Sequence, residues 1–259
     1  MLLGQAVQLA AQKADWKVGI QTWTFHNLTL METLDKTQQL GMRYAEAFFF
    51  QELGAPFPKE TYLNYDLSDD DCALLRHEFK KRGIKPIAFG VASYGTNEEW
   101  DKFFAFAHKI GAHIVTVEPE LNQLDYIESL AKKYDMEVAI HNHPSPCIYA
   151  SAEVVEKALK GRSPLMGVCA DIGHWKRGGE DPLKNLQKLS GRIKVAHLKD
   201  LTDKMEDATW GTGILPVKAF VNELKRQHFN GLISIEYDDF KSDIQEIRNS
   251  LEFLRKCSK

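Results

Sequence analysis

The hydrophobic positions of the chain fall in short apolar runs that alternate with longer segments carrying charged residues on one face. Most of the short runs are continuous and rich in Val and Ile, which is typical of strands buried on both faces of a parallel sheet. We expect a strand at each of eight runs: Lys17–Trp23, Tyr44–Phe49, Ile84–Val91, His113–Glu118, Glu137–His141, Leu165–Asp171, Ile193–Leu198 and Leu232–Tyr237.

The segments between these strands carry the start and stop signals of helices. Ser68 stands before three consecutive Asp residues and predicts a helix N-terminus, while Thr96 predicts another helix that ends at Gly111. The last helix is expected from Ser242 to Lys256. Eight strands alternating with eight helices predict an α/β fold, a (β/α)8 barrel. A doubly wound open sheet alternates in the same way, so the barrel is favoured by the count of eight.

Composition narrows the class of protein. The 259 residues suit one barrel, and no Gly/Ser-rich linker divides them, so we expect an N-terminal extension at 1–15 and a single catalytic barrel at 16–259. A net charge of -3 disfavours nucleic acid as a partner. The four cysteines are widely spread and form no CxxC pair, which indicates free thiols.

Membrane insertion is not expected, because no apolar run is long enough to cross a bilayer. The first residues lack the basic start and the long apolar stretch of a signal peptide. The protein is therefore expected in the cytoplasm, or in the periplasm if the N-terminus is the stub of an export signal.

The later strands all end in side chains that bind metals. Parallel strands of a barrel deliver their C-terminal residues to one rim, where active sites are built. The four ends carry His141-Asn142-His143, then Asp171 with His174 nearby, then His197 with Lys199, and finally Glu236. Imidazole and carboxylate ligands together suit one divalent ion such as Mn²⁺, Zn²⁺, Co²⁺ or Fe²⁺. The hypothesis is a metal site made by His141, Asp171, His197 and Glu236.

Several short sequences carry a resemblance to a known family. They are KVGIQTWTF, AIHNH, DIGHW, KVAHLKD, WGTG and GLISIEYD, in this order. From Val18 to Phe253 the chain resembles the xylose-isomerase-like sugar phosphate isomerase/epimerase family of TIM barrels. The resemblance implies a metal held by strands five to eight, with Asp171, His197 and Glu236 as three of its ligands. At the fourth position family members commonly have Glu, whereas this chain has His141.

The His at position 141 affects the expected mechanism. Many family epimerases use two facing glutamates as base and acid, and an imidazole bound to a metal through one nitrogen cannot use that nitrogen as a base. The leading expectation is a metal-dependent sugar isomerase or epimerase that acts through an enediolate. The alternative is a lyase or hydratase acting on a keto-sugar or an inosose-like substrate.

The remaining candidates could donate or accept protons, or contact the substrate. The candidate acids and bases are Glu236, His174, Lys199 and Glu118; the candidate substrate contacts are Trp23, His143 and Trp175. Most of them have a structural alternative. His174 could have a purely structural role, and Trp23 and Trp175 could be ordinary packing residues. Glu118 could only begin the next helix, Lys199 could only pair with Asp200, and His143 could orient His141 instead of facing the substrate.

Two other functions are compatible with parts of this pattern. An abasic-site endonuclease has the same barrel and metal chemistry, but needs more ligands and a basic face. A non-catalytic sugar-binding barrel stays open, although an intact ligand set speaks against it. The expected partner is a small sugar or polyol, and homo-oligomer formation is left open. The lone Gly211-Thr212-Gly213 predicts a turn and not a nucleotide site.

Overall fold

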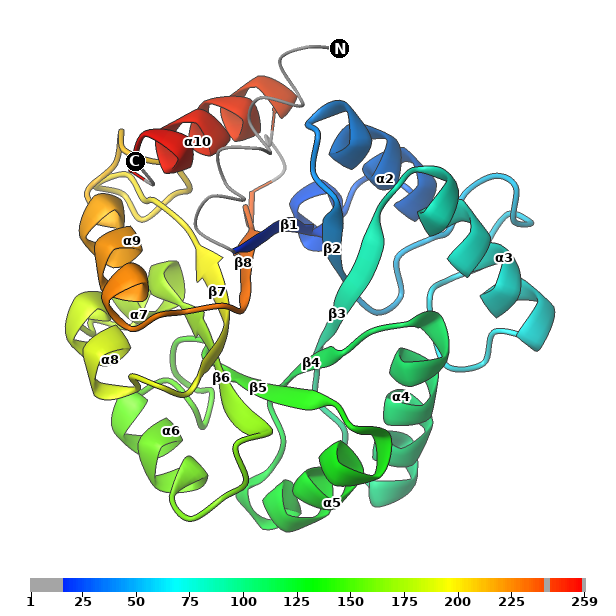
Figure 1. Cartoon of the computed structure of the whole chain (residues 1–259), viewed down its shortest axis with the longest axis horizontal. Helices are drawn as coiled ribbons and strands as arrows, with labels where there is room; N and C mark the ends of the chain where they lie inside the picture. Colours follow the sequence, from blue (N-terminus) through cyan, green and yellow to red (C-terminus); the bar gives the residue numbers. More distant parts are fainter. Residues whose placement is uncertain (1–15, 240–242, 258–259) are drawn as a thin grey trace.

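The computed structural model describes residues 16–239 and 243–257, in which eight parallel strands close into a barrel in sequence order (Figure 1). The strands are β1 (Lys17–Gln21), β2 (Tyr44–Ala47), β3 (Lys85–Ala92), β4 (Ile114–Val117), β5 (Glu137–His141), β6 (Met166–Asp171), β7 (Ile193–Leu198) and β8 (Leu232–Ile235). The barrel closes where β8 pairs with β1, with Ile233 opposite Val18. The predicted (β/α)8 barrel is confirmed. The proposed extension at 1–15 lies outside the described residues.

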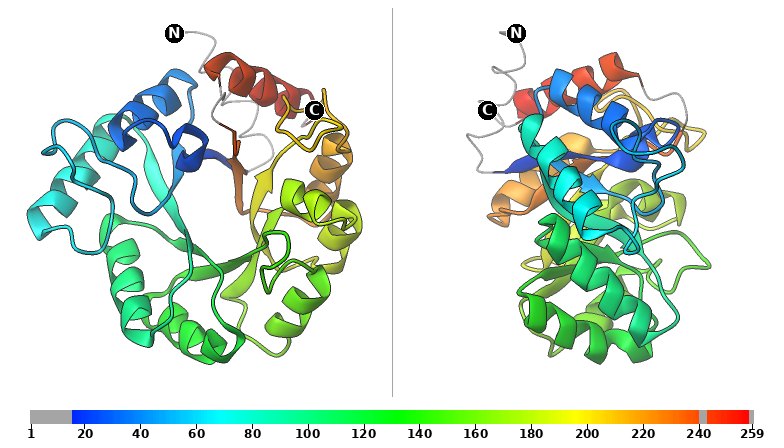
Figure 2. Two further views of the ribbon diagram at one scale, coloured as in Figure 1. Left: turned by 180° about the vertical axis from the view of Figure 1, so that it is seen from behind. Right: turned by 90° about the vertical axis from the view of Figure 1, so that its right-hand side faces the viewer.

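Helices form an outer ring around the barrel (Figure 2). In chain order they are η1 (Thr22–Phe25), α2 (Leu30–Gln39), α3 (Asp69–Lys81), α4 (Asn97–Ile110), η2 (Leu121–Gln123), α5 (Leu124–Tyr134), α6 (Ala152–Leu159), α7 (Ile172–Arg177), α8 (Pro182–Lys188), α9 (Val217–Arg226) and α10 (Ile244–Cys257). The predicted caps are present: the side chains of Ser68 and Thr96 accept hydrogen bonds from the first turns of α3 and α4.

Four strands are shorter at their C-terminal ends than the apolar runs predicted. β1 ends at Gln21, β2 at Ala47, β4 at Val117 and β8 at Ile235. Apolar or acidic residues just beyond the ends of β1, β2 and β8, among them Trp23, Phe48 and Glu236, leave the ladder and line a cavity at the rim. The runs look longer than the strands because apolar side chains continue past the strand ends to line this cavity.

The inside of the barrel changes character along its axis. A small apolar cluster that includes Ala139, Cys169 and Val195 lies within it, and the larger core lies between strands and helices. Toward the C-terminal ends of the strands the buried residues become polar, among them Glu46 and Thr116. The fold therefore places a polar site directly on an apolar base.

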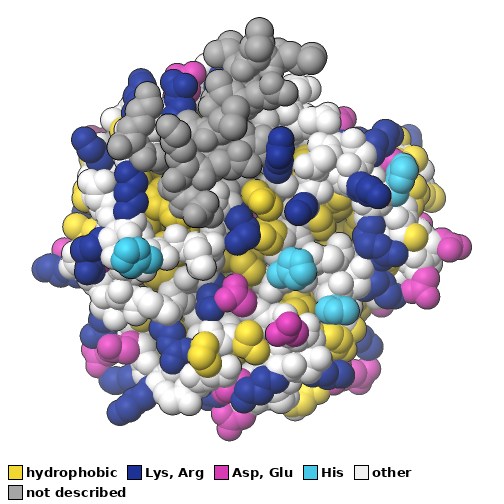
Figure 3. Space-filling model, viewed as in Figure 1, with side chains coloured by type: hydrophobic (Ala, Val, Ile, Leu, Met, Phe, Trp, Pro, Cys, Tyr) yellow, Lys and Arg dark blue, Asp and Glu magenta, His cyan; other side chains and the backbone are white. Residues whose placement is uncertain are grey.

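The surface and the thiols agree with the composition. Basic and acidic side chains are interspersed on the face of the molecule shown in Figure 3. All four cysteines are free. No helix in the described part of the chain is long and apolar enough to span a membrane.

Candidate metal centre and the cavity beside it

The ends of four successive strands bring the predicted ligands together. His141 ends β5, Asp171 ends β6, His197 lies near the end of β7, and Glu236 directly follows β8. One ligand atom from each of the four lies within 4.8 Å of the others, and all four side chains are buried. Residues 95 positions apart in the chain, such as 141 and 236, meet because the barrel closes.

The four converging atoms have the geometry of a metal site. His141 Nε2 lies 3.8 Å from Asp171 Oδ2, while His197 Nδ1 lies 3.7 Å from the same oxygen and 2.9 Å from Glu236 Oε2. None of these four buried atoms makes a hydrogen bond, although the Lys199 ammonium pairs with the two carboxylate oxygens; buried polar atoms in this state favour a ligand that satisfies them. Donor atoms about 2.1 Å from a divalent ion lie about 3.0–3.4 Å apart. The residues present therefore fit such an ion.

Each of the two histidines of this cluster also contacts a carboxylate through its far nitrogen. His141 Nδ1 lies 2.9 Å from Glu118 Oε1, and His197 Nε2 lies 2.8 Å from Glu46 Oε2. A carboxylate that accepts the N–H of the far nitrogen leaves the lone pair of the opposite nitrogen, which faces the centre, available to an ion once the ring is neutral. Glu46 was not predicted from the sequence, although one acidic residue in the otherwise apolar YAEA strand is a signal for it.

Asp171 is held so that one of its oxygens is left for the centre. Its Oδ1 caps α7 by accepting the backbone N–H of His174 at 2.7 Å. Its backbone is fixed by Asn142, whose side chain donates to the Asp171 carbonyl and accepts from the Asp171 N–H, both at 2.9 Å. Oδ2 is thus the atom that points at the other ligands.

A buried lysine sits beside the ligand carboxylates. Lys199 Nζ lies 3.0 Å from Asp171 Oδ2, 2.9 Å from Glu236 Oε2 and 2.8 Å from both oxygens of Asp238. Burial lowers the pKa of Lys199, but these carboxylates outweigh it and raise the pKa well above its ordinary value. The side chain is therefore a permanent cation. Asp238, which lies just after the last strand, was not predicted from the sequence.

The alternative pairing of Lys199 with Asp200 is wrong. Asp200 accepts backbone N–H groups of Gly211, Gly213 and Leu215 at 2.9 to 3.0 Å and so holds the loop after β7. Consecutive residues point to opposite sides here, so Lys199 faces the centre. The Gly211-Thr212-Gly213 segment is a turn that is tied to this aspartate.

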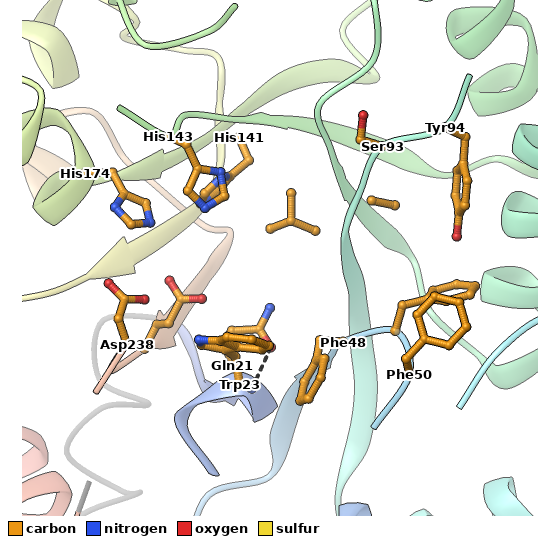
Figure 4. A pocket seen from close by; sticks show the side chains of 14 residues that line it. Gln21, Trp23, Phe48, Phe50, Ser93, Tyr94, His141, His143, His174 and Asp238 are labelled. Carbon is orange, nitrogen blue, oxygen red and sulfur yellow. Dashed lines mark hydrogen bonds between the residues drawn. The ribbon is translucent and has the colours of Figure 1, made fainter. Parts of the chain in front are cut away.

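A cavity of about 570 Å³ opens next to the ligands. In Figure 4, His141, His143, His174 and Asp238 lie on one side, and Phe48, Phe50 and Tyr94 lie on the other, with Trp23 and Gln21 between. The expected wall residue Trp23 is in place. Trp175 is not: it is completely buried in the core, so the expectation that it contacts substrate is wrong. Phe48, Phe50 and Tyr94 were not predicted; the FFF run was a signal for the first two.

The expected acids and bases occupy distinct positions. His143 lines the cavity and also hydrogen-bonds to Glu118, so it both faces the substrate space and touches the partner of His141. Burial lowers the pKa of His174 to about 3, so its imidazole is neutral. Burial raises the pKa of Glu118, but hydrogen bonds with His141 and His143 outweigh this effect and hold the pKa below its ordinary value. The carboxyl group is therefore ionised. Glu118 hydrogen-bonds to two imidazoles and is not among the described residues that line the cavity, so we propose a positioning role for it in place of direct proton transfer.

Replacing Glu118 by Gln is expected to weaken divalent-metal binding by about tenfold or more, because His141 loses the charged acceptor that fixes its ring. Titration with Zn²⁺ in competition with a chelator measures this. Glu120→Gln, two residues away on the exposed surface, is the matched control. Unchanged affinity in Glu118→Gln would show that His141 is oriented by packing alone.

Metal binding is expected to release about two protons near neutral pH. Burial lowers the pKa of His141, but Asp171 and Glu118 outweigh it and raise the pKa to about 9. Burial also lowers the pKa of His197, but neighbouring anionic groups, among them Glu46 and Glu236, raise it well above its ordinary value. Below these pKa values protons compete with the ion, so affinity should rise by about a hundredfold per pH unit between about pH 6 and 8. Calorimetry in buffers of different ionisation enthalpy counts the protons; a pH-independent affinity would contradict the two-histidine site.

Comparisons with known proteins give the relatives of the chain. A crystal structure of an uncharacterized protein from Parabacteroides distasonis ATCC 8503 is 96% identical, with a TM-score of 0.80, and the match covers 94% of this chain and 99% of that one. An inosose dehydratase from Bacillus cereus (strain AH820) is 31% identical over 113 residues, which are 43% of this chain and 32% of the dehydratase. The match thus spans about a third of that relative's length.

Solved structures of low identity show the same fold. A D-psicose 3-epimerase from Clostridium cellulolyticum H10 has a TM-score of 0.75 at 13% identity, with 94% of this chain and 99% of that chain covered. The IolI protein with a bound zinc atom has a TM-score of 0.72 at 17% identity, with 93% and 96% covered. The model of the xylose isomerase-like TIM barrels matches residues 34–257. The resemblance read from the sequence is confirmed, and the chain belongs to the xylose isomerase-like TIM barrel family.

Proposed function

We propose that the protein is a divalent-metal-dependent lyase that removes water or an alcohol from a keto-sugar or keto-polyol. The observation that carries this is the His141–Glu118 hydrogen bond of 2.9 Å. This hydrogen bond fixes the orientation of the His141 imidazole at the end of strand five, where the resemblance would lead one to expect a glutamate. The end of strand five therefore offers no carboxylate to the cavity. Glu236 is then left without the facing glutamate that a symmetric epimerase uses, while an elimination needs only one base beside the carbonyl.

Glu236 is the proposed base. Burial raises its pKa, but Lys199 and His197 lower it below its ordinary value, so the carboxylate is ionised and can accept a proton. Its Oε2 faces the other ligands and its side chain also lines the cavity. We infer that Oε1 takes the proton from the carbon next to the substrate carbonyl. A bound divalent ion would supply Lewis acidity for the negative charge that develops on the carbonyl oxygen.

The elimination balances without an oxidant or reductant. The electron pair of the broken C–H bond forms a carbon–carbon double bond, and the C–O bond at the next carbon breaks. The leaving oxygen takes a proton and departs as water or an alcohol. His143, which lines the cavity on the side of the histidines, is the proposed donor. Its other contact, Glu118, is ionised and holds the ring in place.

The relatives support the same chemical class. The matched inosose dehydratase is named for the loss of water from a keto-polyol. A 3-DHS dehydratase from Bacillus anthracis has a TM-score of 0.72 at 12% identity and shares the fold.

Isomerisation or epimerisation is the second candidate, and one observation favours it. Glu236 and the imidazoles of His143 and His174 all line the same cavity, so a proton removed by one group can be returned by another. The two reactions share the first proton transfer and differ in the second step, which either breaks a C–O bond or returns the proton to carbon. A site of this kind can therefore be tested for both with one substrate.

The test incubates the purified protein, loaded separately with Mn²⁺, Zn²⁺, Co²⁺ or Fe²⁺, with a keto-inositol and with a 3-keto-glucoside in D₂O. A lyase lowers the substrate mass by one water or one alcohol, and the loss stops when a chelator removes the metal. An isomerase keeps the heavy-atom composition and introduces deuterium. Deuterated isomers without loss of mass would replace the lyase by the second candidate. Neither change with any metal would leave a non-catalytic sugar-binding barrel.

A further inference from the structure

The cavity has two chemically different halves. The half next to the ligands carries His143, His174, Glu236 and Asp238. The opposite half is built mainly from aromatic and aliphatic side chains, with Ser93 beside Tyr94 (Figure 4). The apolar half comes from three separate segments, which follow β1, follow β2 and end β3. A substrate that fits both halves has one polar end that reaches the metal centre and one apolar end.

No cation faces this cavity among the described residues that line it. The two basic side chains nearest to the centre are already engaged: Lys199 is buried against carboxylates, and Arg177 pairs with Asp207 at 2.9 Å and with Asp238. Glu236 and Asp238 add negative charge. A phosphate group placed in the aromatic half would find no lysine or arginine among the described lining residues, so this half favours an uncharged group.

The cavity is larger than a single sugar needs. Even at the ~30 Å³ that one water molecule occupies in the liquid, the twelve non-hydrogen atoms of a hexose fill about 360 Å³. The cavity volume is about 570 Å³. The space that remains lies along the aromatic half, so a second, apolar group is expected there.

The aromatic half is exposed and held in place. The side chain of Phe50 is 66% exposed and that of Trp23 is 39% exposed. Phe50 packs edge-on against Phe49 with ring centroids 5.1 Å apart, and Trp23 packs edge-on against Phe48 at the same distance. Large exposed aromatic rings fixed at the mouth of a cavity gain free energy when a planar apolar group covers them.

We propose that the substrate is an uncharged glycoside with an aromatic aglycone, bound with its sugar ring at the ligand side and its aglycone between Trp23, Phe50 and Tyr94. This inference rests on the proposed lyase function in one respect: the aglycone is then the alcohol that leaves. The binding preference itself does not depend on catalysis, since it follows from the lining alone.

The experiment compares three probes by calorimetry with the Zn²⁺-loaded protein: phenyl β-D-glucopyranoside, methyl β-D-glucopyranoside and glucose 6-phosphate. The phenyl glycoside is expected to bind at least about tenfold more tightly than the methyl glycoside, which is about 1.4 kcal/mol. Glucose 6-phosphate is expected to bind more weakly than both. Equal affinities for the two glycosides, tightest binding of the phosphate, or no binding of either glycoside overturns the proposal.

Variants locate the preference on the aromatic half. Phe50→Ala and Trp23→Ala are expected to lose most of the phenyl advantage and to keep the methyl glycoside affinity. Tyr62→Ala is the matched control, because Tyr62 is 41% exposed and does not line this cavity. All three replaced rings are partly exposed, and circular dichroism verifies that each variant is folded. A phenyl advantage that survives in both wall variants contradicts the proposal.

Failure of this inference and failure of the lyase function can be told apart. Glu236→Gln is expected to keep the phenyl preference while losing elimination. If no keto-sugar loses mass but the phenyl glycoside still binds more tightly than the methyl glycoside, only the proposed lyase function is contradicted. If a keto-inositol is dehydrated and the two glycosides bind equally well, only the proposal of an aromatic aglycone is contradicted.

Discussion

Under the proposed lyase function, the Glu236→Gln variant is expected to turn over a keto-sugar substrate about 10³-fold more slowly than the unmodified protein. The substitution keeps the shape of the side chain but removes the proton acceptor and one anionic ligand, and general-base catalysis alone contributes about 10²–10⁴-fold. Initial rates are measured by the loss of substrate mass at saturating metal. The position of Glu236, buried directly after β8 and lining the cavity, is the reason for the size of the effect.

Two measurements make the Glu236 result specific. Glu156→Gln is the control, since Glu156 lies on α6, pairs with Lys188 at 3.1 Å and has a half-exposed side chain. It should leave the rate unchanged. Metal content is determined for both variants, and excess Zn²⁺ is supplied so that weaker binding does not limit the rate. A Glu236→Gln rate within about tenfold of the original would remove Glu236 from the role of base.

The Lys199→Met variant is expected to lower the free energy of unfolding of the metal-free protein by about 3–5 kcal/mol. Lys199 is completely buried, and its ammonium group lies within 3.0 Å of carboxylate oxygens of Asp171, Glu236 and Asp238. Methionine has a similar volume, so the loss comes from buried negative charge that has no counterion. Urea unfolding of the chelator-treated protein measures it.

Binding of a divalent metal is expected to restore part of the free energy of unfolding that Lys199→Met loses. A divalent ion among Asp171, His197 and the other ligands supplies the positive charge that Lys199 otherwise provides, so Zn²⁺ is expected to stabilise Lys199→Met more than the original protein. Lys184→Met is the control: Lys184 is largely exposed and pairs with Asp181 at 3.6 Å, so little change is expected. Equal stabilisation of Lys199→Met and the original protein by Zn²⁺ would argue against a metal that sits beside this lysine.

Much of this protein was determined by the sequence alone. The apolar runs indicated eight strands, because the burial of a strand on both faces is visible in its local sequence pattern. The number of strands then favoured a closed barrel. The four candidate ligands could also be named in advance. Each lies at or near the end of a strand or directly follows one, and the strands of a parallel barrel deliver these ends to one rim.

The partners of those ligands were decided only by the tertiary structure. Glu46 on β2 meets His197 on β7, 151 positions later, and Lys199 meets Asp238 instead of its neighbour Asp200. Such pairs depend on how neighbouring strands are staggered and on which way each side chain points, and neither is a local property of the chain. The same holds for the buried Trp175 and the exposed Phe50. Both are aromatic residues near a strand end, and only packing against the rest of the barrel separates the core residue from the cavity wall.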